Sequence, residues 1–304
     1  MNLFATVLTY PAPSANYRGE SELNRTVIQK VTDGRFDYPI ISPEAMRNAL
    51  REILALYGLP CNRERLHDEE QLAVKYASYP DPDEYVDDYF FGYLIAASGA
   101  DRKKIFKEVK REAFTFKRDS VLRMNLAKAL EPYRHNTVFT QSPLSAEGSA
   151  YQNAKTSALL HRETVVSAFQ YPFAINLNHC QDKPDWTRAL LKAIGELNGV
   201  SGNHARSYYE MAPASIVVRL TEQLVAGYRT YGFEKQGERY DFPEVVAGLL
   251  HDPPDYPAEE FYVGGQIVKD MDDEKRDQLT QAGATLDRNP RTLLETVGNV
   301  GLGG

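Results

Sequence analysis

The sequence is poor in the residues that build covalent or metal cross-links. Of its 304 residues only two are cysteines, Cys61 and Cys180, and neither belongs to a CxxC pair or to a His/Cys cluster at metal-ligand spacing. We therefore expect no structural zinc and no disulfide framework. Apolar runs are also short, and no window approaches the roughly 20 apolar residues of a membrane span. These absences predict a cytoplasmic protein without a membrane partner.

Familiar catalytic signatures are missing as well. The chain has no P-loop or dinucleotide-binding glycine-rich loop, no HExxH and no GxSxG, and its six histidines are scattered. Asp33 and Asp37 bracket Gly34 and could act as acids or metal ligands, but an Asp-Gly pair more often forms a turn. We therefore predict no catalytic residue, no metal site and no cofactor.

Charge is present but unevenly distributed. The formal charge of −7 and the pI near 5.5 argue against a general nucleic-acid coat. Residues 101–134, however, carry eleven Lys/Arg against five acids (net +6), residues 68–88 carry eight acids and one lysine (net −7), and residues 241–304 carry thirteen acids and five bases (net −8). Such a chain can bind a polyanion on one surface and present acids to a basic patch of a neighbouring copy. Solvated faces of ordinary helices are the alternative interpretation.

Local patterns predict a mixture of strands and helices. The apolar run 3–8 indicates a buried first strand, and residues 14–38 are polar and expected to form a loop. Ser42, Pro43 and Glu44 are a helix start, followed by apolar residues at helical spacing. Further helices are expected to begin at Pro184 and near Asp272. The remaining expectations are a hairpin over 135–157 and strands within 113–118, 164–177 and 207–220.

Strand, helix, strands, helix and strand is the order of a ferredoxin-like fold, the layout that RNA-recognition domains use. The predicted fold class is therefore α+β. Residues 61–112 lack the apolar continuity of a core, which indicates an inserted subdomain.

Two groups of residues could bind phosphate. Arg47 and Arg51 lie four residues apart on one face of the first predicted helix, where two guanidinium groups and the helix start could hold an anion. The alternative is an exposed face on which Arg51 is balanced by Glu44 or Glu52. The glycine-flanked loop and the early polar stretch could also contact RNA through Asn203, His204 and Arg206 and through Asn24, Arg25, Gln29 and Lys30. A simple turn is the alternative for the loop.

Several stretches together resemble one family, the backbone subunit of type I CRISPR Cascade complexes, in its DevR-like autoregulator branch (type I-B-like). They are YPIISPEAMRNALREIL (Tyr38 to Leu54), FKRDSVLRMNLAKALEPY (Phe116 to Tyr133), FQYPFAINL (Phe169 to Leu177) and GVSGNHARSYYEMAPASIVVRLT (Gly199 to Thr221). The resemblance runs from about residue 1 to 222. Each motif alone has little specificity, but their order and spacing make the combination specific.

The resemblance implies a modified ferredoxin-like (RRM-like) palm with an inserted finger subdomain and a thumb hairpin. The implied division is 1–60 palm, 61–112 finger, 113–135 palm, 136–160 thumb, 161–240 palm and 241–304 acidic C-terminal extension. It also implies that the basic residues of the first helix, the loop and the early polar stretch hold RNA, and that Leu144 or Tyr151 is a thumb wedge.

The implied function is a non-catalytic subunit that polymerises along crRNA and presents it for pairing with target DNA. Its partners would be the crRNA, target DNA through the guide, other copies of itself and other Cascade subunits. Two alternatives stay open. One is a metal-dependent endoribonuclease like type III relatives, with Asp33 as its loop aspartate. The other is a general single-stranded RNA-binding regulatory module.

Overall fold

The computed structural model describes residues 1–14, 17–22, 25–67, 72–110, 114–141, 159–200 and 208–303. It is an α+β structure built on one mixed sheet with the strand order β21-β20-β17-β1-β16-β12-β6-β5, and β11 also pairs with β16. All neighbours are antiparallel except the parallel pair β20 and β21. The strands are β1 Asn2–Leu8, β5 Lys30–Asp33, β6 Phe36–Ile41, β11 Leu122–Met124, β12 Ala127–Ala129, β16 Phe169–Asn176, β17 Ser215–Thr221, β20 Phe261–Gly265 and β21 Thr285–Asp287.

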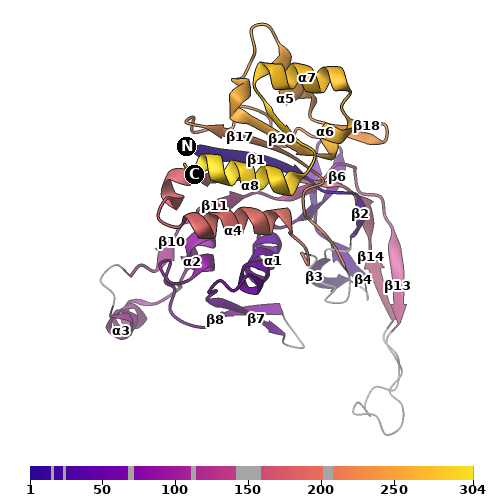
Figure 1. Ribbon diagram of the computed structural model, residues 1–304. Helices are drawn as coiled ribbons and strands as arrows, with labels where there is room; N and C mark the ends of the chain where they lie inside the picture. The colour runs from indigo at the N-terminus through magenta and orange to yellow at the C-terminus, as the bar shows by residue number, and fades with distance from the viewer. Residues whose placement is uncertain are drawn as a thin grey trace.

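Three helices cover one face of this sheet (Figure 1). They are α1 Pro43–Leu56, α4 Pro184–Gly195 and α8 Pro290–Gly301. Successive side chains of a strand point to opposite faces, so Leu3, Ala5 and Val7 of β1 all enter the core beneath these helices. The shorter helix α2 (Val86–Phe91), which lies within the predicted finger segment 61–112, contributes Phe90 to the same core.

A second core lies on the other face of the sheet. It contains Leu8, Val217 and Val263, whose strand neighbours point to the first core. The elements that complete this C-terminal lobe are β18 Glu234–Gln236, β19 Arg239–Asp241, α5 Pro243–Leu250, η2 Ala258–Glu260, α6 Gln266–Asp270 and α7 Asp273–Ala282. The predicted acidic extension therefore supplies two strands of the central sheet and, through α8, part of its helical cover.

The helix starts that the sequence predicted are confirmed. The Ser42 hydroxyl accepts a hydrogen bond from the Ala45 amide at 3.2 Å, and α4 begins at Pro184. Helix α7 is capped by Asp272, whose carboxylate accepts from the Lys275 amide at 2.7 Å, and it ends at Gly283 in the left-handed region.

The interpretation of residues 14–38 as a loop was wrong. Strands β3 (Tyr17–Glu22), β4 (Arg25–Ile28), β5 and the start of β6 occupy this stretch. Strands β3 and β4 pair with each other, as do β5 and β6, and their polar composition hid these local pairs from the sequence. The additional pairs of β4 with β14 and of β6 with β12 join segments that are distant in sequence. The predicted strand 164–177 is two strands, β15 (Val165–Ser167) and β16. Of the strand predicted within 113–118, the described residues 114–118 contain β10 (Lys117–Arg118) alone.

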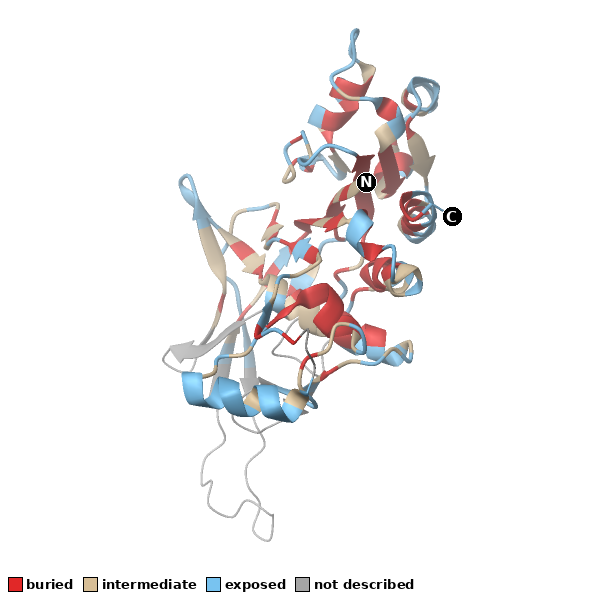
Figure 2. Ribbon diagram, turned by 90° about the vertical axis from the view of Figure 1, so that its left-hand side faces the viewer, coloured by how far each residue is buried: buried red, intermediate tan, exposed pale blue. Residues whose placement is uncertain are grey.

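Smaller elements surround the central layers. Strands β13 (Thr137–Gln141) and β14 (Leu159–Glu163) pair antiparallel, in agreement with the predicted hairpin, and β14 also pairs with β4. The remaining elements are β2 Ala12–Ser14, which pairs with β15, the hairpin β7 Arg63–His67 and β8 Leu72–Tyr76, β9 Tyr93–Leu94, which pairs with β10, α3 Gly99–Val109 and η1 Leu177–Cys180. Helix α3 buries none of its residues and is exposed along its length (Figure 2).

In the described part of the chain, no helix combines the length and the apolar character that crossing a membrane requires.

Candidate nucleic-acid interface

A cavity of about 460 Å³ lies where the start of α1 meets the end of α2 and the segment 117–120. Basic side chains dominate its lining, and we call it the cationic cavity. The charged residues that line it are the basic Arg47, Arg51, Arg63, Lys117 and Arg118 and the acidic Glu44 and Asp119. The two arginines predicted from the first helix are therefore brought together with three cations from other segments.

Arg51 is held more tightly than the sequence predicted. An exposed, charge-balanced helix face was the alternative to a phosphate site, but only 7% of Arg51 is exposed, because α2 packs against this side of α1. Its Nε lies 3.6 Å from Oδ2 of the fully buried Asp87, its Nη1 donates to Asn48 Oδ1, and its guanidinium lies over the Phe91 ring at 4.9 Å. Arg51 therefore has a structural partner as well as a position in the cavity wall.

Burial, followed by the nearby guanidinium of Arg63, lowers the pKa of Arg51 to about 10, and the Asp87 carboxylate opposes this shift. Arg51 stays charged at neutral pH. The lowered pKa reflects mainly the burial of the guanidinium group, and the charges of Arg63 and Arg47 add to it, so a bound anion would favour the charged form.

Asp87 also organises the finger side of the cavity. Its Oδ1 accepts the Asn62 amide at 2.7 Å and its Oδ2 accepts the Arg63 amide at 3.1 Å. The neighbouring Asp88 accepts a hydrogen bond from the Asn62 side chain at 2.7 Å. Two consecutive buried carboxylates thus set the path of the chain that carries Arg63 into the cavity wall.

Aromatic rings orient the other guanidinium groups. Arg63 lies over the Tyr76 ring at 5.0 Å and donates from Nη2 to the Gly92 carbonyl at 2.5 Å, and Arg118 lies over the Tyr89 ring at 5.3 Å. The Nε atoms of Arg47, Arg51, Arg63 and Arg118 are all buried and make no hydrogen bond. Because these Nε atoms are covered by protein, an anion in the cavity would be bound by the outer guanidinium nitrogens and by the net positive charge of the lining.

Sequence reasoning missed Arg63, Lys117 and Arg118 as site residues. A signal existed for the last two, because the FKRDSV segment lies in one of the motifs that carry the family resemblance. Arg63 had no local signal, since the hydrogen bonds that position it come from Asp87 and Gly92 in the chain beyond it.

The early polar stretch contributes structural contacts. Lys30 Nζ lies 3.2 Å from Glu163 and 4.0 Å from the centroid of the Tyr133 ring, and the Gln29 carbonyl accepts the Ile40 amide. Burial acts to raise the pKa of Glu163, but hydrogen bonds from Ile28 and Lys30 outweigh it and lower that pKa below its usual range. Arg25 belongs to β4. The roles of Arg25, Gln29 and Lys30 in RNA binding stay predictions.

Six predicted residues lie outside the described part of the chain: Asn24, Leu144, Tyr151, Asn203, His204 and Arg206. Asp33, the aspartate of the nuclease alternative, is paired with Lys128 at the end of β5. Within the described ranges no group of three or more His, Cys, Asp or Glu residues is arranged to hold a metal ion.

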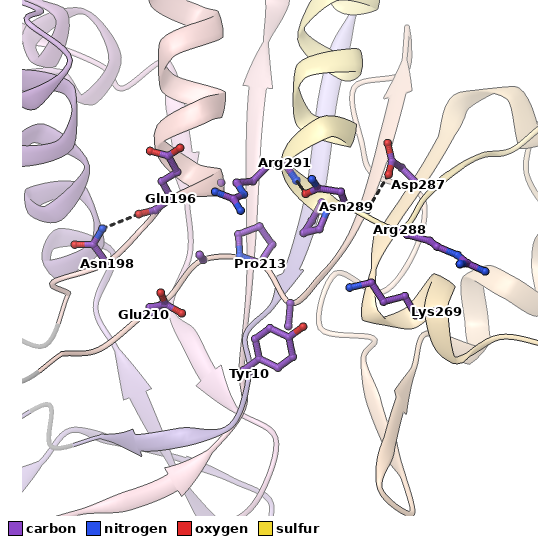
Figure 3. Close-up of a pocket in the computed structure, with 14 residues that line it drawn as sticks. Tyr10, Glu196, Asn198, Glu210, Pro213, Lys269, Asp287, Arg288, Asn289 and Arg291 are labelled. Atoms are coloured by element: carbon purple, nitrogen blue, oxygen red, sulfur yellow. Dashed lines mark hydrogen bonds between the residues drawn. The ribbon is translucent and has the colours of Figure 1, made fainter.

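A second cavity, of about 680 Å³, lies between the C-terminal end of α4 and the start of α8 (Figure 3). We call it the mixed-charge cavity, because its lining balances three cations with three acids: Lys269, Arg288, Arg291, Glu196, Glu210 and Asp287. Asn289 caps α8 there by accepting the Arg291 amide at 3.0 Å. A balanced lining gives this cavity no general preference for a polyanion.

Comparisons with known proteins place the fold in context. No family model matches the chain. A chain of a "CRISPR RNA-guided surveillance complex, pre-nicking" superposes with a TM-score of 0.62, at 12% identity, over 99% of this chain and 100% of that one. A chain of a second "CRISPR RNA-guided surveillance complex" gives 0.57, at 11% identity, over 99% of each. The protein therefore has a fold found in chains of RNA-guided surveillance complexes.

The sequence comparison is more specific. A protein of Myxococcus xanthus (strain DK1622) described as "CRISPR-associated protein Cas7/Cst2/DevR" is 29% identical over 295 residues, which is 93% of this chain and 92% of that protein. This relative confirms the family resemblance that the sequence motifs predicted.

Proposed function

We propose that this chain is a backbone subunit of a type I CRISPR Cascade complex, which polymerises along crRNA and presents it for pairing with target DNA. The observation that carries the proposal is the cationic cavity, in which four arginines and one lysine face two acids. A phosphate offers charged oxygens that accept from guanidinium groups in paired geometry. The relative and the fold described above support the same assignment.

In this proposal the cavity holds a phosphate of the guide and does not read its sequence. Contacts to the sugar-phosphate backbone position a strand without discriminating bases, which is what a guide carrier requires, because base pairing must do the reading. The subunit itself is proposed to be non-catalytic. The pairing of Asp33 with Lys128 is the observation against the nuclease alternative.

The proposed shape is a ferredoxin-like (RRM-like) palm formed by the central sheet, with residues 61–112 as finger and residues 136–160 as thumb. Helix α3, which carries Arg102, Lys103, Lys104 and Lys107, stands at one end of the molecule, and the acidic lobe with α5 and α7 stands at the other (Figure 1). Complementary charge at opposite ends supports head-to-tail stacking of copies, since such contacts generate open helical filaments.

The test is assembly of the full-length chain on a guide-length RNA, followed by size-exclusion chromatography with light scattering. Replacing Arg47 and Arg118 together by Gln is expected to prevent assembly while the monomer stays folded, because neither residue has a buried ion-pair partner. Arg51→Glu is a poor test, because it would bury a second carboxylate beside Asp87.

Arg188→Gln is the matched control, since Arg188 pairs with Asp185 on α4 and lines neither the cationic nor the mixed-charge cavity. Assembly by the Arg47/Arg118 double variant with wild-type stoichiometry would contradict the proposal. Loss of assembly by Arg188→Gln to the same extent would show that the effect is not specific to the cavity.

A further inference from the structure

The central sheet leaves part of one face without helical cover. Side chains of β1 that point away from α1, α4 and α8 are Asn2, Phe4, Thr6 and Leu8. Leu8 enters the second core, and Thr6 is buried with its hydroxyl donating to the Thr230 carbonyl at 2.8 Å. Phe4 belongs to neither core and is only partly buried.

Strand register creates a hollow beside the Phe4 ring. Arg123 of β11 is paired with Ala174 of β16, and Ala174 is paired with Phe4, so the three side chains form one row across the sheet. The methyl group of Ala174 is too short to fill the space between a phenyl ring and a guanidinium group. A cavity of about 570 Å³ occupies this position, and we call it the sheet-face cavity.

This cavity adjoins the cationic cavity. Arg118, Asp119 and Ser120 line both cavities. A single-stranded nucleic acid whose phosphate contacts Arg118 would therefore have its neighbouring nucleotide within reach of the sheet face. Arg123 is exposed, and among the described residues it makes no ion pair or hydrogen bond. The row therefore offers one aromatic face, one uncommitted guanidinium group and a small residue between them.

We propose that the sheet-face cavity binds a nucleobase of the same single strand, stacked on the Phe4 ring and contacted by Arg123. The proposal rests on the function proposed above and adds a base-binding site to its phosphate site. Bases stack on aromatic rings of sheets in a sequence-tolerant way, and a guanidinium plane can cover the other face of a base. A base at this site would be withheld from pairing with target DNA.

The experiment uses the full chain with a guide-length RNA that carries 5-iodouridine, irradiated in the complex, with the cross-linked peptide identified by mass spectrometry. A base stacked on Phe4 is expected to cross-link to that residue. Phe4→Leu, which keeps an apolar side chain but removes the ring, is expected to abolish the cross-link and weaken RNA binding about tenfold.

Ala174→Leu provides an independent variant, because it keeps the Phe4 ring and fills the hollow. It is expected to reduce the cross-link and the affinity as Phe4→Leu does. Phe36→Leu is the matched control, since Phe36 is an exposed aromatic residue of β6 outside the three cavities. Thermal unfolding of each variant verifies that it is folded.

The two proposals fail in different ways. Wild-type chain that does not bind the RNA would overturn the proposed function and this site with it. Wild-type binding that depends on Arg47 and Arg118, with no cross-link at Phe4 and unchanged affinity in Phe4→Leu and Ala174→Leu, would overturn the nucleobase site alone.

Discussion

The cationic cavity and the mixed-charge cavity differ in charge far more than in size. Their volumes are about 460 and 680 Å³, and both are formed at the end of a helix. In the cationic cavity five bases face two acids. In the mixed-charge cavity bases and acids are equal in number, and Asn289 and Asp287 hydrogen-bond to nearby backbone amides. The contrast teaches that the net charge of the lining, and not cavity volume, marks the candidate site.

Removing the carboxylate beneath the cationic cavity should have the largest effect. Asp87→Ala leaves the buried Arg51 without its ion-pair partner and two backbone amides without their acceptor. We expect a loss of about 3–5 kcal/mol in the free energy of unfolding, measured by urea denaturation. Asp87→Ala combined with Arg51→Met should recover part of it, and an equal loss in both variants would show that the ion pair is not the cause.

Charge removal in each cavity tests the contrast directly. Arg47→Gln with Arg118→Gln should weaken RNA binding roughly 100-fold, about tenfold for each arginine. Arg288→Gln with Arg291→Gln, in the mixed-charge cavity, removes the same formal charge and should change affinity little. Affinities measured over a salt series should give a slope shallower by about 1.4 for the first pair only, if each arginine contacts one phosphate. Equal losses of RNA affinity for both pairs would show that the two cavities do not differ in RNA binding.

A glycine in the wall of the cationic cavity tests how closely its segments approach. Gly92 has φ +64°, and a Cβ there would lie 2.3 Å from the Arg118 carbonyl oxygen. Gly237 has the same φ but open space around it. Gly237→Ala should lower the free energy of unfolding by about 1 kcal/mol, because alanine must adopt a positive φ there. Gly92→Ala should lower it further, because its Cβ also clashes, and should weaken RNA binding. Equal costs would show that the backbone at 118 moves aside freely.

The smallest effect is expected at the mixed-charge cavity. Asn289→Ala removes the side chain that caps α8 and should lower the free energy of unfolding by about 1 kcal/mol, measured by thermal or urea unfolding. RNA affinity should be unchanged, because the cap supports the helical cover and not the cationic cavity. A large loss of RNA binding with intact stability would assign the mixed-charge cavity a role in binding.

Elements with local signals were predictable. Helices α1, α4 and α7 begin where Ser42, Pro184 and Asp272 predicted, because caps act through neighbouring atoms. Strands β3 to β6 were missed, since their composition is polar and two of them, β4 and β6, also pair with strands distant in sequence. In the site, the spacing of Arg47 and Arg51 was readable, but the contribution of Arg63 was not.

By itself, the sequence determined the α+β class, the helix starts, the clustering of basic residues and the family resemblance, because these depend on residue type and short spacing. Only the tertiary structure decided that Arg51 is buried against Asp87, that Arg63 and Arg118 join it, and that the acidic C-terminal segment completes the central sheet. These outcomes depend on burial and on contacts between segments that are distant in sequence. Burial raises the free-energy cost of a charged group, and the distant contacts decide which ion-pair partners it has.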